Sequence, residues 1–239
     1  MPAITLNSEQ KKIIKKYINV FKKYTQGEQF QEHQKDRLDR VSYFQNKLPK
    51  RVDKLSETEI SELITMLWAS QMWGNKQYFA QKIISQNGIE KLRDEFKLLL
   101  NKSLPVATRY ERFLKEVKSL GPASLTEMLC YIQPETCGIW NQKARQGLKI
   151  LGLNTYIDTE KYRISSEEYN TFNEILQAVS KELKNAGFQD VDMLFVDFFL
   201  YQVSQTSKPP EPESFDHDEI KDMIQNIGIM LGFEAETEV

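Results

Sequence analysis

The sequence predicts an all-α fold, and three observations support that prediction. Apolar residues recur at intervals of three and four along most of the chain, which is the pattern of amphipathic helices. Residues that favour helix starts stand before many of these stretches, and glycine or proline follows them. The chain has 239 residues, of which 40% are hydrophobic and 28% charged, a composition typical of a globular protein of one or two domains.

Two helices are expected in the first fifty residues. The first begins at Ser8 as its N-cap and ends near Gly27, because its apolar face stops there. The second is a very polar helix that spans about 28–46. Pro49 closes it, because proline cannot donate the hydrogen bond that continues a helix.

Three helices are expected between residues 56 and 101. Ser56 and Glu59 have the spacing of a capping box, which predicts a helix start directly before an apolar run. Two shorter helices follow at about 76–86 and 89–101. Asn87-Gly88 is the turn between them, since this dipeptide favours a break in regular structure.

The middle of the chain predicts three closely spaced helices. Pro105 opens the first, which stops at the tetrapeptide Ser-Leu-Gly-Pro at 119–122. The second follows at once and ends before Pro134. Asn141 is the expected N-cap of the third, which runs to about Leu151.

Two further helices complete the expected body of the protein. Ser165 and the following serine open a long amphipathic helix that is closed by Gly187. The run 191–203 is apolar on nearly all sides, which favours a buried central helix.

The domain organisation follows from composition. We expect a helical domain at 1–205, an extended Pro/Glu linker at 206–214, and an acidic segment at 215–239. The last segment predicts one extra amphipathic helix, at about 220–231, and a possible short terminal strand.

Charge divides along the same boundary. Residues 1–205 hold 30 basic and 25 acidic side chains, whereas residues 206–239 hold two and nine. This mildly basic body permits a nucleic-acid partner, but a lysine-rich solvated surface is the favoured explanation, because the excess of basic residues is far below that of a dedicated DNA-binding protein. No apolar run long enough for a membrane span and no secretory signal is visible, so we expect a cytoplasmic protein without a membrane partner.

The turn at 119–122 has a physical reason to bind phosphate. A glycine between two helices lets a phosphodiester approach a helix N-terminus, where main-chain N–H groups point outward. Basic residues on the preceding helix are expected to flank it: Arg109, Arg112, Lys115 and Lys118. The alternative is an ordinary hairpin of two helices.

Three segments together resemble the helix-hairpin-helix DNA glycosylase superfamily, of which endonuclease III is a member. They read LITMLWASQMWGNKQYFAQKII, VKSLGPASLTEMLCYIQPETCGIWNQKARQGL and, more weakly, DVDMLFVDFFLYQ. The resemblance implies a glycosylase-like helical bundle that binds double-stranded DNA, modified or damaged, and inserts Gln71 into the base stack. It further implies a base pocket at Trp140 and Asn141, and DNA contacts by Gln71, Trp73, Asn75, Lys118, Leu120, Gly121, Pro122 and Ser124.

Departures from the family pattern argue against its chemistry. The hairpin's first glycine is replaced by Ser119, and Ala123 stands where a lysine would form a Schiff base. Asn141 stands where an aspartate would supply negative charge or activate water, and an amide cannot do either. Cys130 and Cys137 are too few for an iron–sulfur cluster, so we expect them in the core and expect no cofactor or metal.

Other polar residues near these segments have competing interpretations. Asn141 is explained by its role as an N-cap. Glu127 is expected to be a solvated carboxylate rather than a group in a groove. Asp158 is a possible substitute acid, although its sequence context favours a turn. No catalytic residue is therefore assigned.

The acidic end resembles the opening of a PD-(D/E)xK restriction-type nuclease domain, in which a helix precedes the first core strand. The leading hypothesis is a catalytically degenerate, glycosylase-like DNA reader that serves as the recognition part of a restriction or defence nuclease. One alternative is an active monofunctional DNA glycosylase that uses an acid such as Asp158. The other is a helical protein-interaction module.

Overall fold

The computed structural model describes residues 4–72 and 74–206. Within these ranges the chain forms ten α-helices, three short 3-10 helices, one short π-helix and no strand. The predicted all-α class is therefore confirmed for the described residues. The chain divides into two compact units, 1–205 and 206–239. The first residue of the predicted linker, Thr206, ends the last α-helix. The rest of that linker, the predicted terminal helix and the predicted terminal strand lie outside the described residues.

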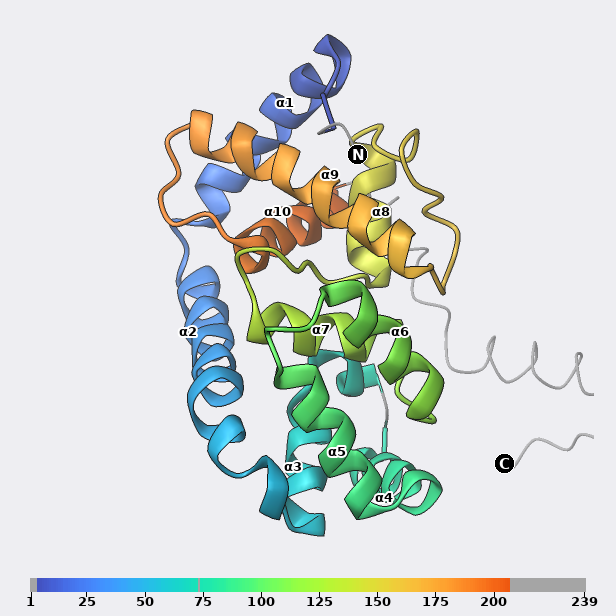
Figure 1. Ribbon diagram of the computed structural model, residues 1–239. Coiled ribbons are helices and arrows are strands. Elements are labelled where there is room, and N and C mark those ends of the chain that lie inside the picture. Colours follow the sequence, from blue (N-terminus) through green and yellow to red (C-terminus); the bar gives the residue numbers. More distant parts are fainter. Residues whose placement is uncertain (1–3, 73, 207–239) are drawn as a thin grey trace, which may run out of the picture. The chain divides into compact units, whose positions relative to one another are not determined.

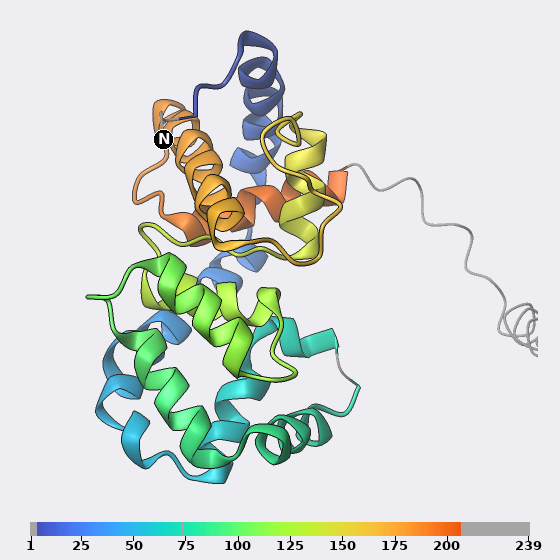
Figure 2. The ribbon, with the colours of Figure 1, turned by 45° about the vertical axis from the view of Figure 1, so that its right-hand side comes forward.

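The helices of the first unit form two groups (Figures 1 and 2). The first group contains α1 (Ser8–Tyr24), α8 (Gln142–Ile150), α9 (Ser166–Asn185) and α10 (Met193–Thr206). The second group contains α3 (Glu57–Met66), α4 (Lys76–Asn87), α5 (Ile89–Leu100), α6 (Val106–Glu116) and α7 (Pro122–Ile132). The helix α2 (Glu28–Ser42) leads from the first group to the second, and α6 packs against α9 across the boundary.

Most helix starts are set by local capping, as the sequence predicts. Ser56 with Glu59 and Ser165 with Glu168 form complete capping boxes. The first helix is an exception to the expected assignment, because its N-cap is Asn7 and not Ser8. The Asn7 side chain accepts the main-chain N–H of Gln10 at 2.9 Å, and the Gln10 side chain accepts the N–H of Asn7 at 3.0 Å.

The second helix ends earlier than predicted. Its α-helical part stops at Ser42, and the chain continues as a π turn, Tyr43–Lys47, and then as 3-10 turns, Leu48–Lys50 and Val52–Lys54. The change of winding precedes Pro49, whose missing N–H and rigid ring prevent an α-helix from continuing through it. A third 3-10 segment, η4 (Trp68–Met72), lies between α3 and α4.

The core is aliphatic and aromatic, and α10 lies within it as the sequence predicts. Its buried apolar side chains are Met193, Leu194, Val196, Phe198, Phe199, Leu200 and Val203. One charged side chain, Asp197, is buried with them, with 4% of the residue exposed. No helix in the described part of the chain is both long and apolar enough to span a membrane.

Candidate functional site

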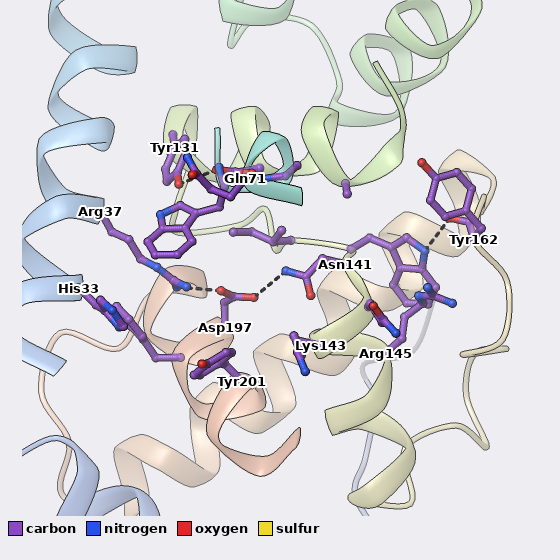
Figure 3. A pocket seen from close by; sticks show the side chains of 18 residues that line it. His33, Arg37, Gln71, Tyr131, Asn141, Lys143, Arg145, Tyr162, Asp197 and Tyr201 are labelled. Atoms are coloured by element: carbon purple, nitrogen blue, oxygen red, sulfur yellow. Dashed lines mark hydrogen bonds and ion pairs between the residues drawn. The ribbon is translucent and has the colours of Figure 1, made fainter. Parts of the chain in front are cut away.

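A cavity of about 820 Å³ lies where the two groups of helices meet, between α2, η4, α7, α10 and the start of α8 (Figure 3). Its volume falls in the range of small-molecule sites, about 300–1,000 Å³. Aromatic side chains form much of its wall: Trp68, Tyr131, Trp140, Tyr162, Phe198 and Tyr201. The cavity therefore offers flat apolar surfaces together with a few polar groups, which suits a planar aromatic ligand.

Asp197 is one of two buried carboxylates in the wall of this cavity, and Arg37 of α2 forms an ion pair with it (Figure 3). The Arg37 Nη1 atom lies 2.7 Å from Asp197 Oδ2 and also donates to the carbonyl of Leu194 at 3.2 Å. The guanidinium stacks on the ring of Phe198, 3.8 Å from its centre. Burial by itself lowers the pKa of Arg37, but the adjacent carboxylate outweighs this effect and the net shift is upward. The Arg37 guanidinium is therefore charged at neutral pH.

Asn141 lies at the start of α8 and serves as its N-cap, as predicted. Its Oδ1 atom accepts the N–H of Ala144 at 2.8 Å. Its Nδ2 atom donates to Asp197 Oδ1 at 3.4 Å, so the amide and the carboxylate lie side by side in the cavity wall (Figure 3).

Trp140 precedes Asn141 and is almost fully buried, with 1% of its surface exposed. Its main-chain N–H donates to Thr126 Oγ1 at 2.9 Å, and its indole N–H donates to the carbonyl of Tyr162 at 3.2 Å. Trp140 and Asn141, the residues expected to form a base pocket, thus both line one cavity. The same cavity also contains Gln71.

Glu127 corrects a prediction, because it is buried rather than solvated. Only 2% of the residue is exposed, and it accepts three hydrogen bonds. The main-chain N–H groups of Trp68 and Ala69 donate to it at 2.6 and 2.8 Å, and the Tyr131 hydroxyl donates at 2.8 Å. Burial raises the pKa of Glu127, while these donors act in the opposite direction. The carboxylate of α7 therefore holds the start of η4 in place.

Side-chain hydrogen bonds fix Lys118 and Ser119 in the turn between α6 and α7, whereas no side chain caps the start of α7. Asn87 accepts the N–H of Lys118 at 2.8 Å and donates to the carbonyl of Lys118 at 3.0 Å. Ser119 adopts a φ of +65°, in the left-handed region that favours glycine, and its hydroxyl donates to Gln86 at 2.6 Å. The turn therefore imposes a left-handed backbone on a residue that carries a Cβ atom.

Gly121 is the N-cap of α7 and offers no side chain to its amides. Among the described residues, no acceptor takes the N–H groups of Gly121, Ala123 or Ser124. A Cβ atom at position 121 would collide with the hydroxyl of Tyr162, whose side chain is 60% exposed. Ala123 lines the cavity, so the open helix start and the cavity are adjacent.

Several residues expected to contact DNA have other local roles. Leu120, Pro122 and Ser124 are buried, so their side chains are not exposed for contacts with DNA. Asn75 is the N-cap of α4 and accepts the N–H of Tyr78 at 2.9 Å. Gln71 is exposed and accepts from Lys76. Trp73 lies outside the described residues.

Two of the four basic residues expected to flank the turn are engaged elsewhere in the fold. Arg109 is completely buried and donates to the carbonyl of Leu99 at 2.9 Å and to Gln133. Arg112 is paired with Glu95 at 3.1 Å. Lys115 and Lys118 are exposed.

Asp158, the possible substitute acid, does not line the cavity. It is exposed and accepts the N–H of Glu160 at 3.0 Å, which is the turn that its sequence context favours. Cys130 and Cys137 are buried free thiols, in agreement with their expected place in the core. Within residues 4–72 and 74–206, no three histidine, cysteine or acidic side chains gather as metal ligands.

Sequence reasoning missed Arg37 and Asp197 as site residues. The available signal was a lone carboxylate in the otherwise apolar run of α10, because a buried charge needs a partner. Comparisons with known proteins add nothing to this site: no family model matches the chain, and no curated protein or solved structure is recognisably similar to it.

Proposed function

We propose that residues 1–205 are a DNA-binding domain of the helix-hairpin-helix glycosylase type, which reads a base flipped out of a duplex. The observation that carries the proposal is the position of the open start of α7 directly beside the aromatic cavity, with Ala123 common to both. An uncapped helix start suits a backbone phosphate, and an aromatic cavity suits an unstacked base.

The proposed activity is recognition without bond cleavage. Ala123 stands beside the turn with no amine for covalent chemistry, and Asn141 presents an amide that its helix requires as a cap. The two carboxylates in the cavity are both engaged, Asp197 by Arg37 and Glu127 by three donors. Such a domain serves as the recognition part of a restriction or defence nuclease, whose cleaving residues would lie outside the described residues.

The test is fluorescence anisotropy at low salt with a fully paired duplex and with the same duplex carrying one extrahelical base. The domain binds both through phosphate contacts, and the extrahelical base adds affinity. Gly121→Glu places a carboxylate at the open start of α7 and lowers affinity for both duplexes by about tenfold or more.

Gly27→Glu is a matched control, because Gly27 is likewise a glycine N-cap without a side-chain cap, at the start of α2 and away from the cavity. We expect it to leave DNA affinity within about twofold of the wild type. Equal losses in the two variants, or binding no tighter than that of a control protein of similar charge, would refute the proposed function.

One specific observation favours a second candidate, an active monofunctional glycosylase. The carboxylate of Asp197 lies in the cavity, where it is placed to accept a proton from water as that water attacks the sugar C1′ and the base leaves with the bonding electrons. A release assay over a panel of modified bases decides between the two functions. Base release by the wild type that is lost in Asp197→Asn supports the enzyme, and no release supports the reader.

A further inference from the structure

Trp68 is an exposed aromatic side chain that is nevertheless fixed in orientation. It has 41% of its surface exposed, although its main-chain N–H is held by Glu127 at 2.6 Å and its indole N–H donates to Asp36 at 3.2 Å. The guanidinium of Arg40 lies 5.3 Å from its ring centre, and the ring of His33 packs edge-on at 5.8 Å. A rigid aromatic face in the wall of a cavity is a ready surface for stacking.

The polar edge of the cavity is also fixed in orientation. Arg37 engages Oδ2 of Asp197, which leaves Oδ1 as the acceptor facing Asn141. The N-cap bond to Ala144 commits the oxygen of Asn141, so its NH2 group must be the donor on the other side. The two atoms are 3.4 Å apart, longer than the usual 2.9–3.0 Å, so the bond between them is weak.

We infer that Trp68 and the Asp197–Asn141 pair form a two-point site for one nucleobase, in which Trp68 stacks on the ring and the pair reads the ring's edge. The ligand is a planar heteroaromatic ring with a hydrogen-bond donor and an acceptor on neighbouring edge atoms. The donor faces Asp197 Oδ1 and the acceptor faces the amide of Asn141. This inference rests on the proposed function where the base belongs to DNA, and a free nucleoside offers the same chemistry.

A hydrogen bond to a charged carboxylate is stronger than one to a neutral group. A ring without a donor would leave that buried carboxylate facing an apolar edge, which is costly. The site therefore rejects a flat ring of the same shape that lacks edge hydrogen bonds, even though such a ring stacks equally well. Shape and edge chemistry can consequently be separated by experiment.

Three duplexes that differ only at one extrahelical position distinguish stacking on the ring from hydrogen bonding at its edge. They carry thymidine, its difluorotoluene isostere, or a tetrahydrofuran abasic analogue. Between thymidine and the isostere only the edge contacts change, and between the isostere and the abasic analogue only stacking changes. We expect each step to cost about fivefold to tenfold in affinity.

Two variants show which residue is responsible for each difference in affinity. Trp68→Leu abolishes the difference between the isostere and the abasic duplex. Asp197→Asn abolishes the difference between thymidine and the isostere, because its amide oxygen stays with Arg37 and its NH2 then faces the NH2 of Asn141. Tyr78→Leu and Asp158→Asn are the matched controls, since both residues are exposed and neither lines the cavity. Both differences persist in the controls.

Equal affinity for all three duplexes overturns the inference and leaves the proposed DNA binding intact. Failure to bind any duplex refutes the proposed function instead, and the inference is then decided by titration with free thymidine and its isostere. Quenching of tryptophan fluorescence by thymidine alone, lost in Trp68→Leu, supports a free-nucleoside site. No response to either nucleoside overturns the inference.

Discussion

The starts of α7 and α8 both face the cavity, and they are built in opposite ways. At the start of α8, Asn141 accepts the N–H of Ala144, so the helix satisfies its own donor. At the start of α7, Gly121 has no side chain, and the described residues offer no acceptor for the amides of Ala123 and Ser124. A closed start, in which a side chain accepts the first N–H groups, stabilises the fold. An open start, in which those N–H groups have no acceptor, can donate them to an external anion.

At a third helical start, that of η4, the capping side chain comes from another helix. Its first two amides donate to Glu127 of α7. Two of the three helical starts at the cavity are therefore closed by side chains, and the contrast with α7 is the basis of the proposed DNA contact. The following substitutions test that contrast.

Removing the buried carboxylate that supports the closed start of α8 has the largest effect. Asp197→Ala leaves Arg37 charged, buried and without its partner, and it removes the contact to Asn141. We expect the free energy of unfolding in urea to fall by about 3–5 kcal/mol. Asp158→Ala, at an exposed carboxylate, should change it by less than about 0.5 kcal/mol. A similar small change in both variants would show that the ion pair does not stabilise the site.

Glu127→Gln tests the closed start of η4. The glutamine oxygen still accepts from Trp68 and Tyr131, but its NH2 group faces the N–H of Ala69, so one buried bond is lost. The expected loss is about 1–3 kcal/mol in urea unfolding. Glu135→Gln, at an exposed position, is the control. An unchanged unfolding midpoint in Glu127→Gln would mean that the carboxylate does not hold η4.

Asn141→Ala converts the closed start of α8 into an open one. Loss of the cap costs about 1 kcal/mol, with a further loss from the contact to Asp197. Asn75→Ala removes a cap of the same kind from α4, where the asparagine accepts only from Tyr78 among the described partners. Urea unfolding should therefore give the larger loss for Asn141→Ala. The reverse order would contradict the contact between Asn141 and Asp197.

Ser119→Gly is the mildest change, at the turn before the open start of α7. The φ of +65° costs a serine about 1 kcal/mol relative to glycine. Part of that gain is offset by loss of the exposed bond to Gln86. We expect a net stabilisation of about 0.5 kcal/mol in thermal or urea unfolding. Ser103→Gly, at an exposed serine outside the left-handed region, should give no gain.

The sequence predicted the features that depend on neighbouring residues. The capping box at Ser56, the helix start at Ser165 and the cap at Asn141 are all present, and in each the side chain accepts an amide N–H three residues later. The predicted N-cap of α1, Ser8, was wrong, because Asn7 caps that helix. The end of α2 was also wrong, because the chain changes its winding before Pro49 rather than at it.

The site depends on residues far apart in the chain, which local patterns do not reveal. Arg37 and Asp197 meet only because α2 and α10 border the same cavity. Glu127 is buried only because η4 folds over it, and Arg109 is buried beside Leu99 and Gln133. In each case, helical periodicity predicts the helix on which the residue lies, but the packing of distant segments determines whether its side chain is covered.

The most direct test of the central contrast is an NMR titration of the protein with duplex DNA, followed through its main-chain amide signals. The account predicts large shifts of Gly121, Ala123 and Ser124 as phosphate binds the open start of α7. The amide of Glu168, already bonded to its cap Ser165 at 3.2 Å, serves as the reference and should move little. DNA binding at saturation with unchanged signals at 121, 123 and 124 would contradict the account.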